Sequence, residues 1–416
     1  MVKLLKEANL LGNNVPWIKE FRQKGETVFE KSGLPDAKME NWKYTKPNMF
    51  FDNEFSLNSN DITSTKPDIQ LPFDAYKICF VDGLFSPELS DFPPEAEVLP
   101  IIEAAMFNVN FRLKADKMTK LEEHPFVALN NACFNEGVFV YIPKNCKIER
   151  PIVIINYVNG NNCQKMCNLR NMFVIEENSH IELLEYYCYH GDLKSCYFVN
   201  IVNEIILEKG AKFNHYKVQD DAFKALHIAL TNVEAREESQ YNSFCLQKGA
   251  DLARNETLVS LLGENAHTEV NAAYIMNGWA TIDTTTNIKH LVPNTTSSQL
   301  VKGVVDNQAK GIFQGKIHIA PNAVKTNGFQ LHRALLLSND AEVDVKPELE
   351  IFADDVKCSH GSACGQIDKE HLFYMRSRGI DEETAKKILI NAYLQEVIAK
   401  VDNEKIAEWI KLLLKM

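Results

Sequence analysis

The densest group of chemically versatile side chains lies between Asp354 and Cys364. On an extended strand, Cys358 and His360 are two residues apart and therefore point to the same side. A thiolate and a neutral imidazole are both good ligands for iron or zinc. Taken alone, this spacing more often marks a small buried thiol and a hydrogen-bonded histidine. Two ligands from one strand leave a metal site incomplete, so another segment or another subunit must supply the rest.

Other cysteines and histidines give weaker signals. Cys163 and Cys167 have no companion pair at a zinc-site spacing, which favours incidental thiols. Cys188 and His190 repeat the Cys-x-His spacing inside an aromatic run that is typical of strand packing. Isolated histidines in such a region are usually satisfied core or surface residues, and this applies to His215, His290 and His332.

Motifs for nucleotide binding and hydrolysis are absent from the sequence. It contains no Gly-x-x-x-x-Gly-Lys-Ser/Thr, no Gly-x-Gly-x-x-Gly after a strand and no Gly-x-Ser-x-Gly. We therefore expect this chain to bind no nucleotide, so that any ATP hydrolysis comes from a partner. A carbohydrate-active β-helix enzyme that uses Asp354 and Asp355 is an alternative, but adjacent strand residues face opposite sides, which argues against a catalytic pair.

The region that must position these residues extends from about 76 to 366. Short apolar and β-branched runs recur there, each followed by a turn built on Gly, Asn or Asp. The turn spacings fit a rung of about 16 to 19 residues, apart from one interval of 39 that needs an insertion. Stacked rungs share a core that no single rung can bury, which favours a parallel β-helix over a two-sheet sandwich. The aligned turns begin at Asn145, Asn178, Gly210, Gly249, Asn265, Asn322 and Asp340.

Helical patterns flank this region. Residues 14–31 predict a helix with Asn14 as its cap and Pro16 in its first turn, and the polar stretch 56–67 predicts a linker. Near the C-terminus, Asp381 and Asp402 are the predicted caps of a helical pair. The residues expected to face inward are Ala385, Ile388, Leu389, Ala392 and Val397 in the first helix, and Ile406, Trp409, Ile410 and Leu413 in the second. We divide the chain into a helical region with linker (1–75), a β-helix core (76–366) and a C-terminal helical domain (367–416).

Composition sets limits on the function. The chain has 416 residues with 45% hydrophobic types and a formal net charge of -11, which disfavours nucleic-acid binding. No apolar run approaches the roughly 20 residues that span a bilayer, and the N-terminus lacks a secretory pattern. We therefore expect a cytoplasmic protein without a membrane span, whose ten cysteines are mostly thiols.

The segment around Cys358 also carries a family resemblance. Residues 346–361, KPELEIFADDVKCSHG, resemble the signature of the SufB/SufD family of iron–sulfur cluster assembly proteins, and 372–380, LFYMRSRGI, continues it. The modest length and the motif ENWKYT at 40–45 resemble the SufD branch rather than the longer SufB. Further matches are Gly33-Leu34-Pro35, Phe80-Val81-Asp82-Gly83, Asn130, Ala132 and Phe134 with Gly137, Phe313-Gln314-Gly315-Lys316-Ile317, and Ala334-Leu335-Leu336-Leu337-Ser338.

The resemblance implies a right-handed parallel β-helix between helical segments, in a non-enzymatic scaffold subunit. It implies pairing with a SufB-like paralogue through the β-helix end, and docking of a SufC-like ABC-type ATPase on the C-terminal helices. His360 is then the first candidate and Cys358 the second as ligands of a transient iron or iron–sulfur cluster shared with the partner subunit. Cys364 departs from the family pattern. A homodimer of the isolated chain, and a purely structural partner of SufB without a ligand role, remain open.

Overall fold

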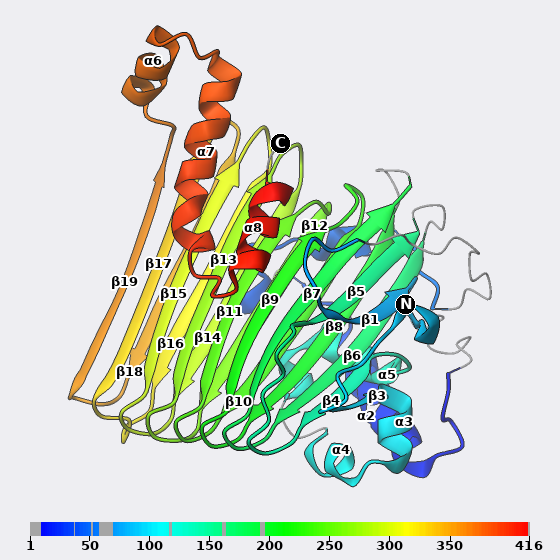
Figure 1. Cartoon of the computed structure of the whole chain (residues 1–416). Coiled ribbons are helices and arrows are strands. Elements are labelled where there is room, and N and C mark those ends of the chain that lie inside the picture. Colours follow the sequence, from blue (N-terminus) through cyan, green and yellow to red (C-terminus); the bar gives the residue numbers. More distant parts are fainter. Residues whose placement is uncertain are drawn as a thin grey trace.

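Between Tyr76 and Gly365 the chain winds into stacked coils, and each coil contributes one strand to each of two facing sheets (Figure 1). The computed structural model describes residues 10–36, 38–50, 53–57, 70–115, 119–159, 164–191 and 196–414. The fold is a mainly β solenoid of about eight turns with helices towards both ends of the chain. The predicted parallel β-helix is confirmed. The sandwich is excluded because successive strands alternate between the sheets and pair in parallel.

The first sheet has ten strands in the order β19-β17-β15-β13-β11-β9-β7-β5-β1-β2. The second has nine in the order β18-β16-β14-β12-β10-β8-β6-β4-β3. The strands of the first sheet are β1 (Tyr76–Val81), β2 (Leu84–Phe85), β5 (Ile152–Asn159), β7 (His180–His190), β9 (Lys212–Asp220), β11 (Gln240–Lys248), β13 (His267–Met276), β15 (Thr296–Val305), β17 (Thr326–Leu336) and β19 (Val356–Gly365). Those of the second are β3 (Glu97–Pro100), β4 (Val138–Ile142), β6 (Lys165–Ile175), β8 (Tyr197–Leu207), β10 (Leu226–Ala235), β12 (Leu252–Leu261), β14 (Thr281–His290), β16 (Lys310–Ile319) and β18 (Glu342–Ile351).

The coil is longer than the turn spacing predicts. His180 is aligned with Lys212, Lys212 with Gln240 and Gln240 with His267, so one coil takes 27 to 32 residues. The rung of 16 to 19 residues is therefore wrong, because each coil has corners on both sides and the two kinds of corner look alike in sequence. The interval of 39 needs no insertion, since it runs from a corner before β9 to the opposite corner before β12.

Left-handed backbone at the corners explains most of the predicted turns. Asn145, Asn178, Gly210, Gly249 and Asn265 all have positive φ, between 55° and 76°, as residues with small or locally hydrogen-bonding side chains tolerate. The two other predicted turn residues, Asn322 and Asp340, do not have positive φ. Near Asn322, it is Lys325 that adopts the left-handed conformation. The pattern also missed Glu238, Asn294 and Asn307, which have φ between 55° and 60°.

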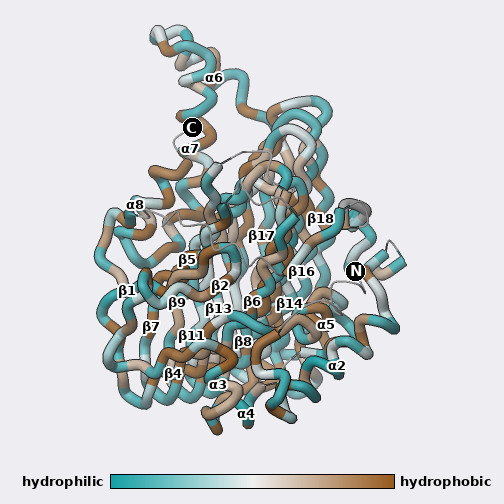
Figure 2. Tube along the Cα trace, turned by 90° about the vertical axis from the view of Figure 1, so that its right-hand side faces the viewer, coloured by the Kyte–Doolittle hydropathy of each residue, from teal (hydrophilic) through white to brown (hydrophobic). Residues whose placement is uncertain are grey.

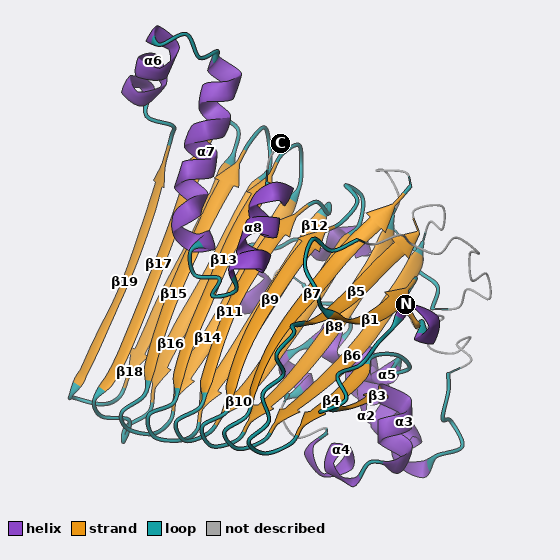
Figure 3. Cartoon of the chain, in the orientation of Figure 1, coloured by secondary structure: helices purple, strands orange, loops and turns teal. Residues whose placement is uncertain are grey.

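The N-terminal helices cover the outer face of the nine-stranded sheet (Figure 3). The first is α2 (Pro16–Ser32), with Pro16 at its start as predicted, but Val15 and not Asn14 occupies the cap position. The linker predicted over 56–67 lies almost wholly outside the described residues. The other helices here are α3 (Ile101–Phe107), α4 (Val109–Lys114) and α5 (Pro125–Ala132), with short 3-10 turns at Glu40–Trp42, Pro47–Phe50, Pro87–Leu89 and Leu121–Glu123. Figure 2 shows the apolar character of β5, which is buried along its whole length, and of α3, which buries Ile101, Ile102, Ala104 and Ala105.

The motif at 40–45 holds the N-terminal segment on this sheet. Trp42 is buried beneath the guanidinium of Arg254, which lies 4.5 Å from the centre of the indole ring. Arg254 also donates to the Asn41 carbonyl at 2.9 Å and forms a buried ion pair with Asp283. The Thr45 hydroxyl donates to the same Asp283 carboxylate. The motif is therefore an anchor between the N-terminal region and the solenoid.

The C-terminal region contains α6 (Lys369–Ser377), α7 (Glu382–Ile398) and α8 (Glu404–Leu413), one helix more than the predicted pair. Asp381 caps α7 as expected, but Asn403 rather than Asp402 caps α8. In α7, Ile388 and Ala392 are exposed. Ala385 and Val397 are buried as predicted, and the helix also buries Ile390, Leu394 and Ile398.

Helices α7 and α8 pack on the outer face of the ten-stranded sheet, whereas α6 projects beyond the strand ends (Figure 1). Among the described residues, no helix combines the length and apolar character required to cross a membrane.

Candidate functional site

Cys358 and His360 lie on β19, the last strand of the ten-stranded sheet. Strand alternation places both side chains on one side, with their Cα atoms about 6.6 Å apart. Cys358 is aligned with Gly328 and His360 with Gln330 on β17. Because both β17 residues are buried and aligned residues of parallel strands face the same way, Cys358 and His360 continue the inward-facing row of the solenoid.

Within the part of the chain that the structure describes, no further coil covers this row. The structure shows β18 and β19 as the terminal strands of their sheets, at the end of the stack opposite the N-terminal helices (Figure 1). His360 is consequently exposed and Cys358 half-buried. We call this end, formed by the free edges of β18 and β19, the open end.

The Cys358 thiol sits at the margin of a small apolar cluster that includes Ile317 and Ile319. Burial raises the pKa of Cys358, and the Gly328 N–H partly offsets that rise. The side chain is therefore held as a neutral thiol at neutral pH. A metal ion that binds it must displace a proton, which is the ordinary chemistry of thiolate ligands.

The chain supplies only part of a metal site here. Across the part of the chain that the structure describes, no three His, Cys, Asp or Glu side chains group closely enough to hold a metal ion. The inward row of β18 at the same end consists of Val343, Val345, Pro347, Leu349 and Ile351, which offer no metal-binding side chain. A soft cation at Cys358 and His360 therefore needs donors from outside this chain.

Cys364 continues the same row and is exposed. It lies four residues beyond His360, about 13 Å along the strand, which is too far for the two to share one ion. Asp354 and Asp355 occupy the turn that precedes β19 rather than the strand.

The remaining sequence candidates lie elsewhere. The three isolated histidines considered in the sequence are buried and hydrogen-bonded, as expected: His215 to Glu185 and Tyr241, His290 to Thr295 and Ser297, and His332 to Tyr274. Cys188 packs beneath the C-terminal helices on β7, and Cys167 is buried in β6. Cys163 lies outside the described residues.

A buried polar network inside the solenoid was not foreseen from the sequence. The Glu185 carboxylate lies 2.7 Å from His215 Nε2, and Lys217 Nζ lies 3.0 Å from His227 Nε2. Asp221 approaches His227 Nδ1 at 3.0 Å. The presence of polar residues at inward-facing strand positions is the sequence signal that could have predicted this network. The cavity beside this network holds only about 40 Å³, so it has no room for a substrate.

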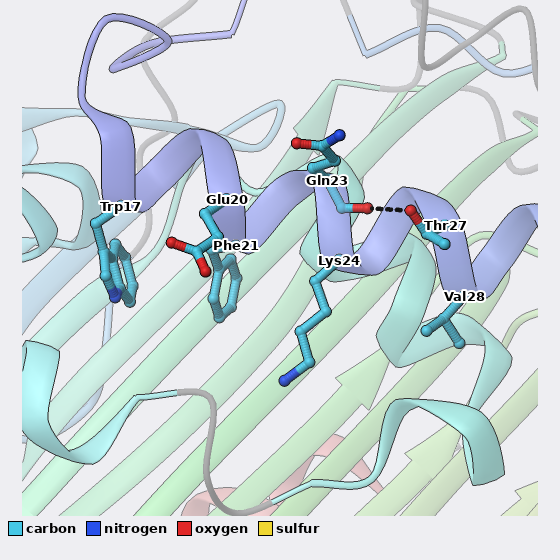
Figure 4. Close-up of a pocket in the computed structure, with 7 residues that line it drawn as sticks. All are labelled: Trp17, Glu20, Phe21, Gln23, Lys24, Thr27 and Val28. Carbon is cyan, nitrogen blue, oxygen red and sulfur yellow. Dashed lines mark hydrogen bonds between the residues drawn. The ribbon is translucent and has the colours of Figure 1, made fainter.

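A larger hollow of about 560 Å³ lies along α2 (Figure 4). Figure 4 shows Trp17, Phe21 and Lys24 along one side of the helix. The lining also includes Glu20, Gln23 and Thr27. In Figure 4, Gln23 and Thr27 project away from the two rings, so the polar groups do not converge as metal binding or catalysis requires. The open end therefore remains the candidate site.

Comparisons with known proteins point to one family. A model described as "SUF system FeS cluster assembly, SufBD core domain" matches residues 156–393, and one for the "SufBD protein N-terminal region" matches 5–154. The chain is 32% identical over 340 residues to an iron–sulfur cluster assembly SufBD family protein of Synechocystis, covering 78% of this chain and 74% of that protein.

Two further relatives are both described as iron–sulfur cluster assembly protein SufD. The chain is 27% identical over 378 residues to the Escherichia coli protein, covering 90% of this chain and 87% of that one. It is 30% identical over 288 residues to the Bacillus subtilis protein, covering 68% and 65%.

Proposed function

Because the chain belongs to the SufBD family of iron–sulfur cluster assembly proteins, we propose that it is the SufD-type scaffold subunit of a SufB–SufC–SufD complex. Membership of this family supports a role in iron–sulfur cluster assembly without catalysis by this chain. In the proposal, iron or a nascent cluster is cargo, held transiently by His360 and Cys358 together with a SufB-like paralogue that docks on the open end.

The main support for the proposal is an incomplete set of metal donors, Cys358 and His360, on the terminal strand of the ten-stranded sheet. His360 is exposed and Cys358 half-buried, both project from an inward row that no coil covers, and the facing row of β18 is apolar. A second solenoid that continues the stack would cover this row and bring its own side chains against it. It would also remove water from the pair, which strengthens metal–ligand interactions there.

The C-terminal helices are the proposed docking site of a SufC-like ATPase. On α6, Phe373 and Tyr374 are 74% and 59% exposed, which is unusual for aromatic side chains without a partner. Only residues 366–368 separate the end of β19 from the start of α6. A force applied to α6 during ATP hydrolysis by the partner would therefore reach the strand that carries His360, and shear the shared edge.

The test is substitution of the two ligands in the co-expressed complex. His360→Ala and Cys358→Ala should leave the complex intact, because surface substitutions at an exposed edge change stability by only about 0.5 kcal/mol. Both should lower the iron and sulfide content of the purified complex several-fold, and His360→Ala should lower cluster-dependent enzyme activity in cells.

Two matched controls separate a ligand role from general damage. Ser362→Ala alters the same inward row, and His190→Ala removes an exposed histidine from the end of β7. Neither should change the iron content. Normal cluster output from the His360→Ala complex would reject the proposed role.

A further inference from the structure

Polar side chains line the interior of the solenoid in two facing columns. The register of the ten-stranded sheet aligns His215 on β9 with one residue on each later strand, ending at His360 on β19. The register of the nine-stranded sheet builds an opposite column, which runs from Asn203 on β8 to Gly315 on β16. The first column consists of His215, Ser243, Val270, Gln299, Gln330 and His360, and the second of Asn203, Thr231, Thr257, Thr286 and Gly315.

A first hydrogen-bonded group connects the two columns on the side of the N-terminal helices. The Asn203 amide donates to the Glu185 carboxylate on β7 at 2.8 Å, and the same carboxylate lies 2.7 Å from His215 Nε2. Asn203 also donates to the Thr231 hydroxyl at 3.4 Å. The two sheets are therefore joined through polar side chains at this level of the stack.

A second hydrogen-bonded group connects the columns nearer the open end. The Thr286 hydroxyl donates to the side-chain carbonyl of Gln299 at 2.6 Å, and the Gln299 amide donates to the side-chain carbonyl of Gln330 at 3.4 Å. The Gln330 amide in turn donates to the Gly315 backbone carbonyl at 3.3 Å. Because Gln330 on β17 is aligned with His360 on β19, this group ends one strand before the open end.

A cavity of about 40 Å³ separates the two groups. Its lining includes His215 from the first group and Thr286 from the second, with Ser243, Cys245 and Thr257 between them. These last three side chains point into the solenoid, yet each is only partly buried. Their accessible surface therefore faces the cavity. Among the residues that the structure describes, none forms a hydrogen bond with the Thr257 hydroxyl.

A polar cavity of this size is suited to water. One buried water molecule needs about 10 to 15 Å³ of cavity volume and makes about three hydrogen bonds, so about two or three molecules fit. The hydroxyls of Ser243 and Thr257 offer both donors and acceptors, and the Lys217 ammonium at the cavity wall offers donors. Without water, the Thr257 hydroxyl would lose hydrogen bonds that it makes in the unfolded chain, which is unfavourable.

We propose that this cavity binds a cluster of about two or three ordered water molecules, which bridge the two hydrogen-bonded groups. The protein then has one continuous polar column from Glu185 to Gln330, and the column leads to His360 at the open end. The volume excludes larger ligands, and the hydroxyl of Thr257 disfavours a dry cavity. This inference is independent of the proposed function, because it rests on the interior of the solenoid alone.

Removing the hydroxyls tests for the water directly. Ser243→Ala with Thr257→Val changes the size of the lining little but makes it more apolar, and apolar cavities stay dry. Magnetic relaxation dispersion of water, measured on the full chain, counts long-lived internal water molecules. The double variant should lose about two of them relative to the wild type, whereas Thr281→Val, on the outer side of β14, should lose none. An unchanged count in the double variant would overturn the inference.

Xenon provides a test that needs no substitution in the wild type. Xenon enters dry apolar cavities but is a poor substitute for water that makes hydrogen bonds. In wild-type crystals under xenon pressure, this cavity should therefore bind no xenon, and in crystals of the Ser243→Ala, Thr257→Val variant it should bind xenon. Xenon density in the wild-type cavity would show that the cavity is dry and the inference wrong.

A cavity-filling substitution should have opposite effects in the two backgrounds. Ala272 on β13 is buried and lines the cavity. In the wild type, Ala272→Val would expel water from the hydroxyls, so the thermal midpoint should fall. In the Ser243→Ala, Thr257→Val background the same valine would fill an apolar void, so the thermal midpoint should rise. Steric overpacking would lower the midpoint in both backgrounds, and that result would contradict the inference.

Discussion

Glu185→Gln is the substitution whose effect follows most directly from the buried network. The Glu185 carboxylate is fully buried on β7 and accepts hydrogen bonds from His215 at 2.7 Å and from Asn203 at 2.8 Å. Burial alone would raise the pKa of Glu185. The hydrogen bond and charge of His215, and then the charge of Lys217, outweigh that effect and lower the pKa from 4.5 to about 2.

The destabilisation expected for Glu185→Gln, and its dependence on pH, follow from this pKa shift. A depression of this size corresponds to about 3 kcal/mol of stability contributed by the ionised form. Because the folded-state pKa of Glu185 lies below its unfolded value, the contribution is fully present above about pH 4.5. It is lost as the pH falls towards about 2. Glutamine keeps the shape but not the charge, so Glu185→Gln should be destabilised by about 3 kcal/mol at pH 7.

Urea unfolding followed by circular dichroism between pH 7 and pH 3 is the assay. The free energies of unfolding of the wild type and of Glu185→Gln should differ most at neutral pH. Below about pH 4.5 this difference should shrink by about 1.4 kcal/mol per pH unit. Glu237→Gln, at a side chain that is 48% exposed, is the control and should follow the wild type throughout. A Glu185→Gln deficit that is the same at pH 7 and pH 3 would refute the reasoning.

Two further substitutions test the packing of the solenoid and its N-terminal anchor. Gly303→Ala should lower the thermal midpoint strongly, since a Cβ there would lie 2.1 Å from the ring of Tyr274, whereas Gly365→Ala meets nothing within 4 Å and should melt like the wild type. Arg254→Ala should cost about 3 to 5 kcal/mol, because it leaves a buried carboxylate unpaired and releases the motif at 40–45. Limited proteolysis should then cut the N-terminal region faster, and equal cleavage of Arg254→Ala and Arg236→Ala, an exposed control, would contradict the anchoring role.

The sequence by itself determined the stacked β architecture and the flanking helices. Short apolar runs that cannot bury themselves must stack, and this requirement is visible in the residue pattern. Local alternation was likewise enough to put Cys358 and His360 on one side of a strand. The starts of α2, α7 and α8 were predicted to within one residue, whereas α3, α4, α5 and α6 were not predicted. At the caps, Val15 and Asn403 replaced Asn14 and Asp402. The difference arises because backbone conformation selects the cap among neighbouring residues.

Only the tertiary structure decided which coil is last and what each corner faces. Exposure of His360 depends on the absence of a further coil over β19, a property of strand pairing and not of the residues nearby. The length of the coil stayed hidden because corners on opposite sides of the solenoid use the same residue types. The network of Glu185 and His215 joins residues that are 30 positions apart. Interactions between distant coils are set by the register of the stack, which no short stretch of sequence encodes.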